Sequence, residues 1–456
     1  MSSAEFGLKG TVRELLRYKG AVLGLAIIIV LVSISIYAVV AIPYDKAVEQ
    51  WRESGYWIKN PKNAAPEWIN YFSGKKLPKS IYLSGEGKVV RDGGRSKLVF
   101  EYSFGYYYDD FPSEIILFVN SNVTRSFYLK ASFLRPDGDH IFLGKYRIKK
   151  GENRIYVTNK LDLEASLEKH VEERLGAKPN FSITIEKALF LAYTGKQEVL
   201  KGGYKIKLEA LTNATNKDVS CEVVIYGKVH GLTGTDHLRR PLSIALIWGT
   251  PVALSFGITA ATLIVLMQLI IATISAWFGG RVDMALQRVT EVYMVLPFLP
   301  TLIMISLFYR ISIWTLLLVV IALSIFGANV KTMRALAMQI KTYPYIEAAQ
   351  AYGASSLRIV FLYMIPKMLP PVIPSIILSV PDFVFLEAVL SFFGLGDPLL
   401  PTWGKLLHDA LENGALYKGL YYWVLEPSAL LVLTAFSFAQ IGLALDKIVN
   451  PRLREI

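Results

Sequence analysis

The feature that most constrains this chain is a series of apolar runs long enough to cross a lipid bilayer. A spanning helix needs about 20 consecutive, predominantly apolar residues, and the uncharged run at residues 21–42 has that length. Apolar residues make up 53% of the chain and charged residues only 19%, which is typical of a protein whose solvent is partly lipid. We predict an α-helical membrane protein with six transmembrane helices. These lie near residues 21–42, 248–277, 292–308, 311–330, 372–393 and 422–446.

Basic residues set the expected orientation. Residues 1–20 are basic, and so are the loops after the second, fourth and sixth spans. Because cytoplasmic loops are enriched in Lys and Arg, we predict a cytoplasmic segment at 1–20 and both termini in the cytoplasm. The same rule accounts for the net charge of +12 without a nucleic-acid partner. A signal peptide is the competing interpretation of residues 21–42, but no small-residue cleavage site follows before Pro43.

Residues 43–238 differ completely from the apolar segments and are expected to form a β-rich extracellular domain, inserted between the first two spans, with a sandwich as its expected architecture. β-branched and aromatic residues favour strands here, and one helix is expected at 163–175, ending before Gly176. The strands are expected at 97–102, 114–120, 125–134, 140–148, 154–158 and 181–185. Residues 239–456 then carry the remaining spans.

The sequence lacks the residue patterns that a disulfide, a metal cluster or an ATP site requires. A single cysteine, Cys221, excludes an intrachain disulfide and a cysteine metal cluster, and the five histidines show no metal-binding spacing. No G-x-x-x-x-G-K-[ST] loop occurs, so the sequence predicts neither an ATP site nor an enzyme. Few Cys and His beside abundant Lys, Tyr and Ile are also typical of a thermophile.

A polar stretch between two spans, residues 347–370, predicts two short amphipathic helices outside the bilayer. Pro344 suits a first helical turn, Gly353 interrupts the pattern, and Ser355 or Ser356 offers an N-cap for the second helix. We expect Pro366 to end that second helix. An ordinary pair of cytoplasmic helices would show the same periodicity.

This stretch resembles the coupling loop of binding-protein-dependent ABC importer permeases, here at residues 344–366. The family pattern places Glu-Ala-Ala, a glycine and a final proline at fixed spacing, with apolar residues before the proline. In this sequence the matching residues are Glu347, Ala348, Ala349, Gly353 and Pro366, while Tyr363 and Ile365 replace the usual Ile and Leu.

Other stretches resemble the second, or C-type, permease of the dipeptide and oligopeptide (peptide/opine/nickel) importers. They are 234–236, 278–283, 386–396, 403–407 and 450–454. After Gly234-Thr235-Asp236 the family's glycine and second aspartate are replaced, which leaves the role of that turn open. The resemblance covers residues 232–456 well and residues 1–42 loosely. It does not cover 44–231, which is a large insertion relative to ordinary members.

The resemblance implies a type I ABC importer permease in the plasma membrane of a prokaryote. Such a subunit forms half of a pore with a homologous second permease and works with an extracellular substrate-binding protein. Two separate ATP-binding subunits hold the ATP and Mg, so no cofactor is expected on this chain. The residues implied in coupling to the ATPase are Glu347, Ala348, Ala349, Gly353, Leu357 and Pro366. The implied substrates are di- or oligopeptides, with oligosaccharides or nickel as alternatives.

Two acidic residues, Asp382 and Glu387, lie inside the apolar segment 372–393. A carboxylate in a membrane span faces protein or water rather than lipid. Each residue therefore lines the translocation path or anchors neighbouring helices, and we favour the anchor. Prolines at 370, 371, 374 and 381 predict broken helix geometry there, and Pro297 and Pro300 predict a kink in the third span.

Other functional classes remain possible from the sequence. A membrane sensor with an extracellular ligand domain would also combine these segments, and a membrane enzyme is a third possibility. The insertion has two possible roles, docking of the substrate-binding protein or shielding that contacts the partner permease. Tyr106, Tyr107 and Tyr108 beside Asp109 and Asp110 could contact a sugar or peptide.

Overall fold

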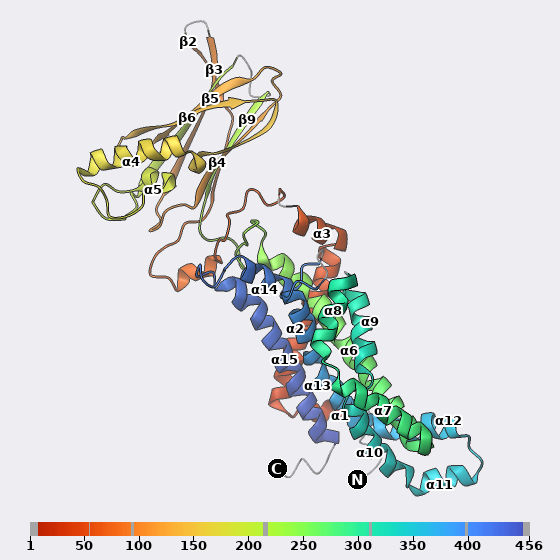
Figure 1. Cartoon of the computed structure of the whole chain (residues 1–456). Coiled ribbons are helices and arrows are strands. Elements are labelled where there is room, and N and C mark those ends of the chain that lie inside the picture. Colours follow the sequence, from red (N-terminus) through yellow and green to blue (C-terminus); the bar gives the residue numbers. More distant parts are fainter. Residues whose placement is uncertain are drawn as a thin grey trace. The chain divides into compact units, whose positions relative to one another are not determined.

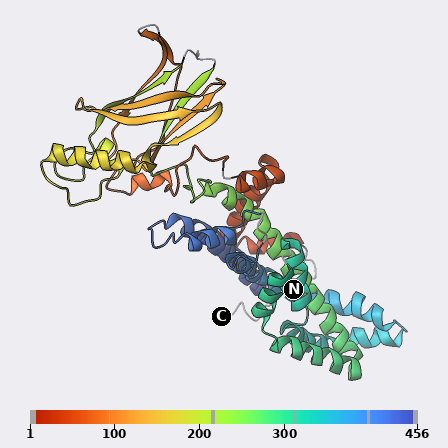
Figure 2. The ribbon, with the colours of Figure 1, turned by 45° about the horizontal axis from the view of Figure 1, so that its top comes forward.

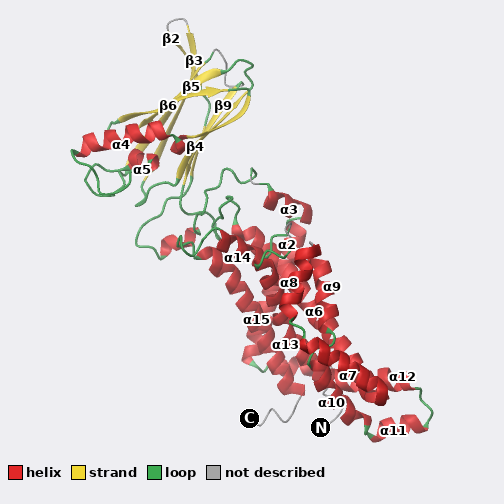
Figure 3. Cartoon of the chain, in the orientation of Figure 1, coloured by secondary structure: helices red, strands yellow, loops and turns green. Residues whose placement is uncertain are grey.

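The computed structural model describes residues 8–53, 55–92, 95–212, 218–309, 312–396 and 400–449. The chain divides into two compact units, one formed by residues 1–52 with 244–456 and the other by residues 53–243. Figure 3 shows that the first unit is helical, whereas all the described strands belong to the second. Each unit is described by itself below.

The helical unit contains long apolar helices together with shorter ones. Its helices are α1 (Leu8–Leu15), α2 (Lys19–Ala41), α3 (Tyr44–Arg52), α6 (Leu242–Phe278), α7 (Gly280–Val295), α8 (Phe298–Tyr309), α9 (Ile313–Ser324), α10 (Asn329–Lys341), α11 (Pro344–Ala351), α12 (Ser356–Arg358), a π-helical turn (Ile359–Met364), α13 (Ile365–Phe392), α14 (Trp403–Glu412) and α15 (Tyr422–Val449). Among the described residues, four helices are long and apolar enough to cross a membrane, and two bent pairs raise that number to six if each pair is one span.

Both bent pairs break inside segments that were expected to be single spans. Helices α7 and α8 meet at 77°, with Pro297 in the break, which confirms the predicted kink. Helices α9 and α10 meet at 53° around residues 325–328, a bend that the sequence analysis missed. Gln268 of α6 donates through Nε2 to the carbonyl oxygen of Ser324, at the end of α9, at 2.8 Å. The same carbonyl oxygen also accepts from Gly327 N–H at 3.1 Å, so a backbone donor and a side-chain donor both bind the end of α9.

Two expectations about the proline-rich segment are wrong. Pro366 does not end a short helix, because the backbone is helical without interruption from Ser356 to Phe392. The wider π-helical turn just before Pro366 makes room for the proline ring, which would clash with the preceding turn of a regular α-helix. Pro370, Pro371, Pro374 and Pro381 lie inside α13 without breaking it. Each proline removes only one backbone donor, and the apolar surroundings preserve the remaining hydrogen bonds.

The second unit is an antiparallel β-sandwich, which confirms the predicted β-rich domain. Its strands are β1 (Ile81–Ser84), β2 (Lys88–Asp92), β3 (Arg95–Tyr106), β4 (Glu114–Ser121), β5 (Phe127–Leu134), β6 (His140–Ile148), β7 (Gly151–Tyr156), β8 (Gly202–Leu211) and β9 (Val219–Tyr226). One sheet has the order β1-β9-β4-β7 and the other β2-β3-β8-β5-β6. Side chains of both sheets share one core, including Phe100, Leu117, Tyr204 and Val223.

Helix α4 (Leu161–Leu175) packs on this core through Leu167 and Val171, and Figures 1 and 2 show this helix beside the strands. The predicted helix is confirmed, and Gly176 ends it in the left-handed conformation with φ +71°. The strand predicted at 181–185 is wrong. Residues 181–184 contain no strand, and α5 (Ile185–Phe190) follows, with Ala188, Leu189 and Phe190 buried in the core.

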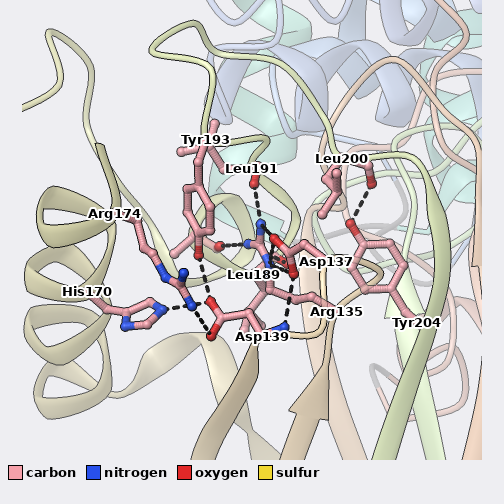
Figure 4. Close-up of polar contacts among 11 residues, drawn as sticks. Arg135, Asp137, Asp139, His170, Arg174, Leu189, Leu191, Tyr193, Leu200 and Tyr204 are labelled. Carbon is pink, nitrogen blue, oxygen red and sulfur yellow. Dashed lines mark hydrogen bonds and ion pairs between the residues drawn. The ribbon is translucent and has the colours of Figure 1, made fainter. Parts of the chain in front are cut away.

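A buried polar cluster ties α4 to the turn between β5 and β6 (Figure 4). Asp139 accepts hydrogen bonds from His170 Nε2 at 2.7 Å, Arg174 at 3.2 Å and the Tyr193 hydroxyl at 3.1 Å. Beside it, Arg135 donates to the carbonyl oxygens of Ala188 and Leu191 at 2.9 and 2.7 Å. Burial acts to raise the pKa of Asp139, but the hydrogen bonds from His170 and Tyr193 and the charges of His170 and Arg174 together hold it below its ordinary value.

The turn at Gly234–Pro241 has a structural role in the same unit. Asp236 is fully buried and accepts hydrogen bonds from the backbone N–H of Arg240, at 2.8 Å, and from its Nε, at 2.5 Å. Arg239 adopts φ +68°, donates to the carbonyl oxygen of Asn60 at 2.6 Å and pairs with Glu114. Arg239, which replaces the glycine of the family pattern, therefore fastens this turn to the sandwich.

The aromatic and acidic residues at 106–110 also have structural partners. Tyr106 is fully buried, and its hydroxyl donates to the carbonyl oxygen of Asp110 at 2.7 Å. Asp109 pairs with Lys201 at 2.5 Å and Asp110 with Lys228 at 2.7 Å. These contacts give Tyr106, Asp109 and Asp110 structural roles in the sandwich, whereas Tyr107 is exposed.

Candidate coupling surface and translocation cavity

The coupling segment, residues 344–366, begins with α11 and turns sharply at Gly353. Gly353 has φ +78°, a conformation that costs little only for glycine. Its N–H donates to Gln350 O at 2.9 Å, and Ala354 N–H donates to Ala349 O at 3.0 Å. This pair of hydrogen bonds is a Schellman motif, which ends α11 with a fixed geometry. The Ser355 hydroxyl then caps the next helix by accepting from Arg358 N–H at 3.4 Å.

One face of the coupling segment is anchored to the helical unit. Ile346, Ile359, Val360 and Met364 are fully buried, and they share a core with residues of α6 and α10. Ala349 is partly buried against the same core. The segment therefore cannot shift without moving the helices beneath it.

The other face of the segment is exposed and mostly apolar. Glu347, Ala348 and Pro366 are exposed, and Tyr352 leaves 92% of its surface uncovered. Leu357, Phe361 and Leu362 add exposed apolar surface on the second helix. Among the described residues, none donates to or pairs with the Glu347 carboxylate. Figures 1 and 2 show α11 and α12 projecting at one end of the helical unit.

Charged side chains brace the helices around this segment. Lys341, at the end of α10, donates to the last carbonyls of α6, those of Ala276 at 3.1 Å and Trp277 at 2.8 Å. Arg334 of α10 pairs with Asp283 of α7, and Asp283 also accepts from Ser275 of α6. These contacts tie α6, α7 and α10 together beside the coupling segment.

A cavity of about 370 Å³ lies at the two helix breaks. Both breaks contribute to its wall, Leu296 and Phe298 from the first and Phe326 to Asn329 from the second. Asp382 and Ser379 of α13 and Gln268 of α6 supply polar groups, and Asp382 is exposed in the single chain. Of these residues, sequence reasoning identified only Asp382. The polar Gln268 inside an apolar span was a signal for a second.

Glu387 occupies a different environment from Asp382. It is only 1% exposed, and its Oε1 accepts a hydrogen bond from the Ser391 hydroxyl at 2.7 Å. Residues five apart on an α-helix point about 140° away from each other, so the two carboxylates lie on different faces of α13. Gly404 of α14 approaches this second face so closely that an added Cβ would lie 2.4 Å from Ala388 O.

The structure thus brings the coupling residues Glu347, Ala348, Ala349, Gly353 and Leu357 into one segment, to which Pro366 is joined by continuous helix. Asp382 and Glu387 are separate from that segment and from each other. Across the described residues, no group of three or more His, Cys, Asp or Glu side chains is placed to hold a metal ion.

Comparisons with known proteins show similarity to membrane transport components. The family model described as "binding-protein-dependent transport system inner membrane component" matches residues 268–455. The chain is 32% identical over 223 residues to the oligopeptide transport system permease protein OppC of Escherichia coli (strain K12), covering 48% of this chain and 72% of that protein. It is 29% identical over 224 residues to the dipeptide transport system permease protein DppC of Bacillus subtilis (strain 168), covering 48% of this chain and 68% of that protein.

Proposed function

The chain belongs to the family of binding-protein-dependent transport system inner membrane components, and we propose that it is the permease subunit of an ATP-driven importer of di- or oligopeptides. The relatives' names, dipeptide and oligopeptide transport system permease proteins, support the substrate class. The chain would form half of the pore with a second, homologous permease. Separate ATP-binding subunits would hydrolyse ATP, and an extracellular binding protein would deliver the substrate.

The observation that carries this proposal is the unbroken helix between the coupling segment and the cavity. It runs from Ser356 to Phe392 and includes Asp382 and the second part of the exposed coupling face, which carries Leu357 and Phe361. At 1.5 Å per residue, Ser356 and Asp382 are roughly 40 Å apart along the helix. A second helix, α10, starts at the cavity with Asn329 and ends next to α11. A displacement of the coupling segment would therefore be transmitted to the cavity walls through two packed helices.

The exposed face of the coupling segment suits a protein partner. It carries several exposed apolar side chains and the single carboxylate of Glu347, which would pair with a basic residue of the ATP-binding subunit. Anchored on one side and fixed at Gly353, the segment loses little conformational freedom on docking, which favours affinity. We assign Glu347, Ala348, Ala349, Gly353 and Leu357 to this interface or its geometry, and Pro366 to the junction with α13.

We further propose six spans with each bent pair counted as one, and the coupling segment in the cytoplasm. Helix α1 packs on the last turns of α15 through Leu15 and Ile448, and both lie at the end of the unit that carries the coupling segment (Figure 1). Both termini would then be cytoplasmic, and the sandwich, which follows the first span, would be extracellular. Asp382 lines the proposed translocation path, whereas Glu387 anchors α13 near α14.

Reconstitution with the partner subunits tests this function. The chain, a second permease and ATP-binding subunits would be placed in proteoliposomes, and ATP hydrolysis would be measured with peptide-loaded binding protein on the permease's outer side. We expect loaded binding protein to stimulate hydrolysis severalfold and to drive uptake of labelled peptide. Unstimulated hydrolysis with no uptake would contradict the proposal and favour a sensor.

A further inference from the structure

We propose that the cavity at the two helix breaks is a cation-selective subsite that receives an ammonium group of the substrate. For a peptide this group is the free N-terminus or a lysine side chain. The inference rests on the proposed function, because it adds the recognised charge to a translocation path that the function requires.

The ionisable groups in the lining of the cavity are of one sign only, negative. Asp382 is its single ionisable carboxylate, and within the described part of the chain the lining contains no lysine, arginine or histidine. Tyr293, Phe298, Phe326 and Phe383 place aromatic rings in the same wall. Aromatic faces attract cations and a carboxylate repels anions, so an ammonium group is favoured here over a carboxylate.

Neutral acceptors in the cavity complement the carboxylate. Gln268 is only 4% exposed, and its Oε1 has no hydrogen-bond partner in the described structure, while its Nε2 is held by Ser324 O. A buried acceptor without a partner costs free energy unless a ligand supplies a donor. The Ser379 hydroxyl donates to Ser375 O at 2.9 Å, which leaves its oxygen lone pairs free to accept. An ammonium group, with three donors and no acceptor, matches these groups.

The exposure of Asp382 indicates that the cavity opens toward water or protein. Asp382 lies midway along an apolar helix, yet the single chain leaves it exposed. A carboxylate at this depth is not stable against lipid. The open side of the cavity would therefore face the partner permease across a hydrated path, where a substrate can reach the carboxylate. A divalent metal ion is disfavoured because it requires several oxygen ligands with more negative charge.

Charged thiol reagents test the selectivity without any transported substrate. Cys221, which is buried in β9, would be replaced by serine, and Ser379→Cys would place a single thiol in the cavity. The rates of thiol modification would be measured with two methanethiosulfonate reagents, one bearing ethylammonium and one bearing ethylsulfonate. Both rates would be measured in protein with Asp382 intact and in protein carrying Asp382→Asn. We expect the ratio of cationic to anionic rates to fall about tenfold in Asp382→Asn. A control thiol introduced by Ser356→Cys, at an exposed position, should show the same ratio of cationic to anionic rates with and without Asp382→Asn.

An unchanged ratio at Ser379→Cys would overturn the inference. Asn329→Cys, in the same lining, provides a second thiol in case the first variant does not fold. If both thiols resist both reagents in folded protein, the cavity is closed to water and the inference also fails.

In the reconstituted importer, N-acetylation of a lysine-free peptide should reduce uptake by wild type and not by Asp382→Asn. Absence of any peptide uptake by wild type would instead count against the proposed function, and the thiol comparison would still stand.

Discussion

At the scale of single residues, the Glu347 carboxylate is the most distinctive group on the coupling surface. It is exposed on a segment whose other exposed side chains are mostly apolar, an arrangement that contributes little to the stability of the chain alone. The periodicity of the sequence predicted a short amphipathic helix here, and Glu347 lies on the exposed side of that helix. The buried face formed with α6 could not be predicted, because α6 is distant in the sequence.

Replacing Glu347 by alanine should uncouple the ATP-binding subunits. Loss of one charge-assisted hydrogen bond costs about 1.5–3 kcal/mol, which corresponds to docking weakened roughly 10- to 150-fold. Stimulated ATP hydrolysis in proteoliposomes measures the effect. Glu412→Ala, at an exposed position of α14, is the matched control and should retain stimulation. Equal activity of the two variants would remove Glu347 from the interface.

Asp139 should make α4 sensitive to acid. Because its pKa is lower in the folded protein than its ordinary value of about 3.9, its contribution to stability is present above that pH and is lost as the pH falls through the folded pKa. The protection factors of the α4 amides in hydrogen exchange, each taken relative to an unfolded peptide at the same pH, measure this loss in the full chain at pH 6 and pH 3. In Asp139→Asn the α4 amides should be less protected than in wild type at pH 6, and their protection should fall less between pH 6 and pH 3. Identical pH responses would show that Asp139 does not hold the helix.

The polar cluster around Asp139 also shows why single residues resist prediction. His170, Arg174 and Tyr193 reach Asp139 from positions 31 to 54 residues away. The turn at 135–139 was recognisable from its proline and glycine, but its partners depend on how α4 and the following loop pack. No local pattern specifies such a contact.

At the scale of elements, helix ends were predicted better than helix continuity. Glycine signals located the ends of α4 and α11 and a serine signal located the start of α12, since both kinds of signal act locally. The helix expected to end at Pro366 instead continues for 26 residues beyond it, to Phe392. The outcome depended on the π-helical turn and on packing against α6, α14 and α15, which a proline rule does not include.

Gly353→Ala should weaken coupling through the geometry of the bend. A side chain at φ +78° costs about 1–2 kcal/mol, and relief of that strain would tilt α11 away from its docking position. Stimulated ATP hydrolysis should fall severalfold. Gly195→Ala is a close control, because Gly195 has φ +79° and, like Gly353, has no heavy atom within 4 Å of an added Cβ. Equal losses in both variants would point to general destabilisation instead of coupling.

At the scale of the whole molecule, the division into two units explains how one chain carries an insertion. The core of the sandwich is contained within residues 98–225, and the helical cores draw on residues outside the sandwich. Composition alone marked this division, since the apolar runs stop after residue 42 and resume near 248. It did not predict the strand order, because β1 pairs with β9 from more than 130 residues away.

Replacing residues 55–240 by a flexible linker of about 20 residues should leave the helical unit assembled. We expect the ATP-binding subunits to co-purify as with the intact chain, because the coupling segment is unchanged. Uptake driven by the binding protein should decrease if the sandwich guides that protein. Loss of the second permease from the purified complex would instead assign the sandwich to subunit assembly.

The most direct test of the central claim is co-purification of the ATP-binding subunits with this chain from detergent. Wild type would be compared with a variant carrying Glu347→Ala and Gly353→Pro, and with Glu412→Ala as control. We predict that wild type and control retain the ATP-binding subunits and the second permease, while the double variant retains only the permease. Retention of the ATP-binding subunits by the double variant, or their absence from wild type, would contradict the proposed coupling.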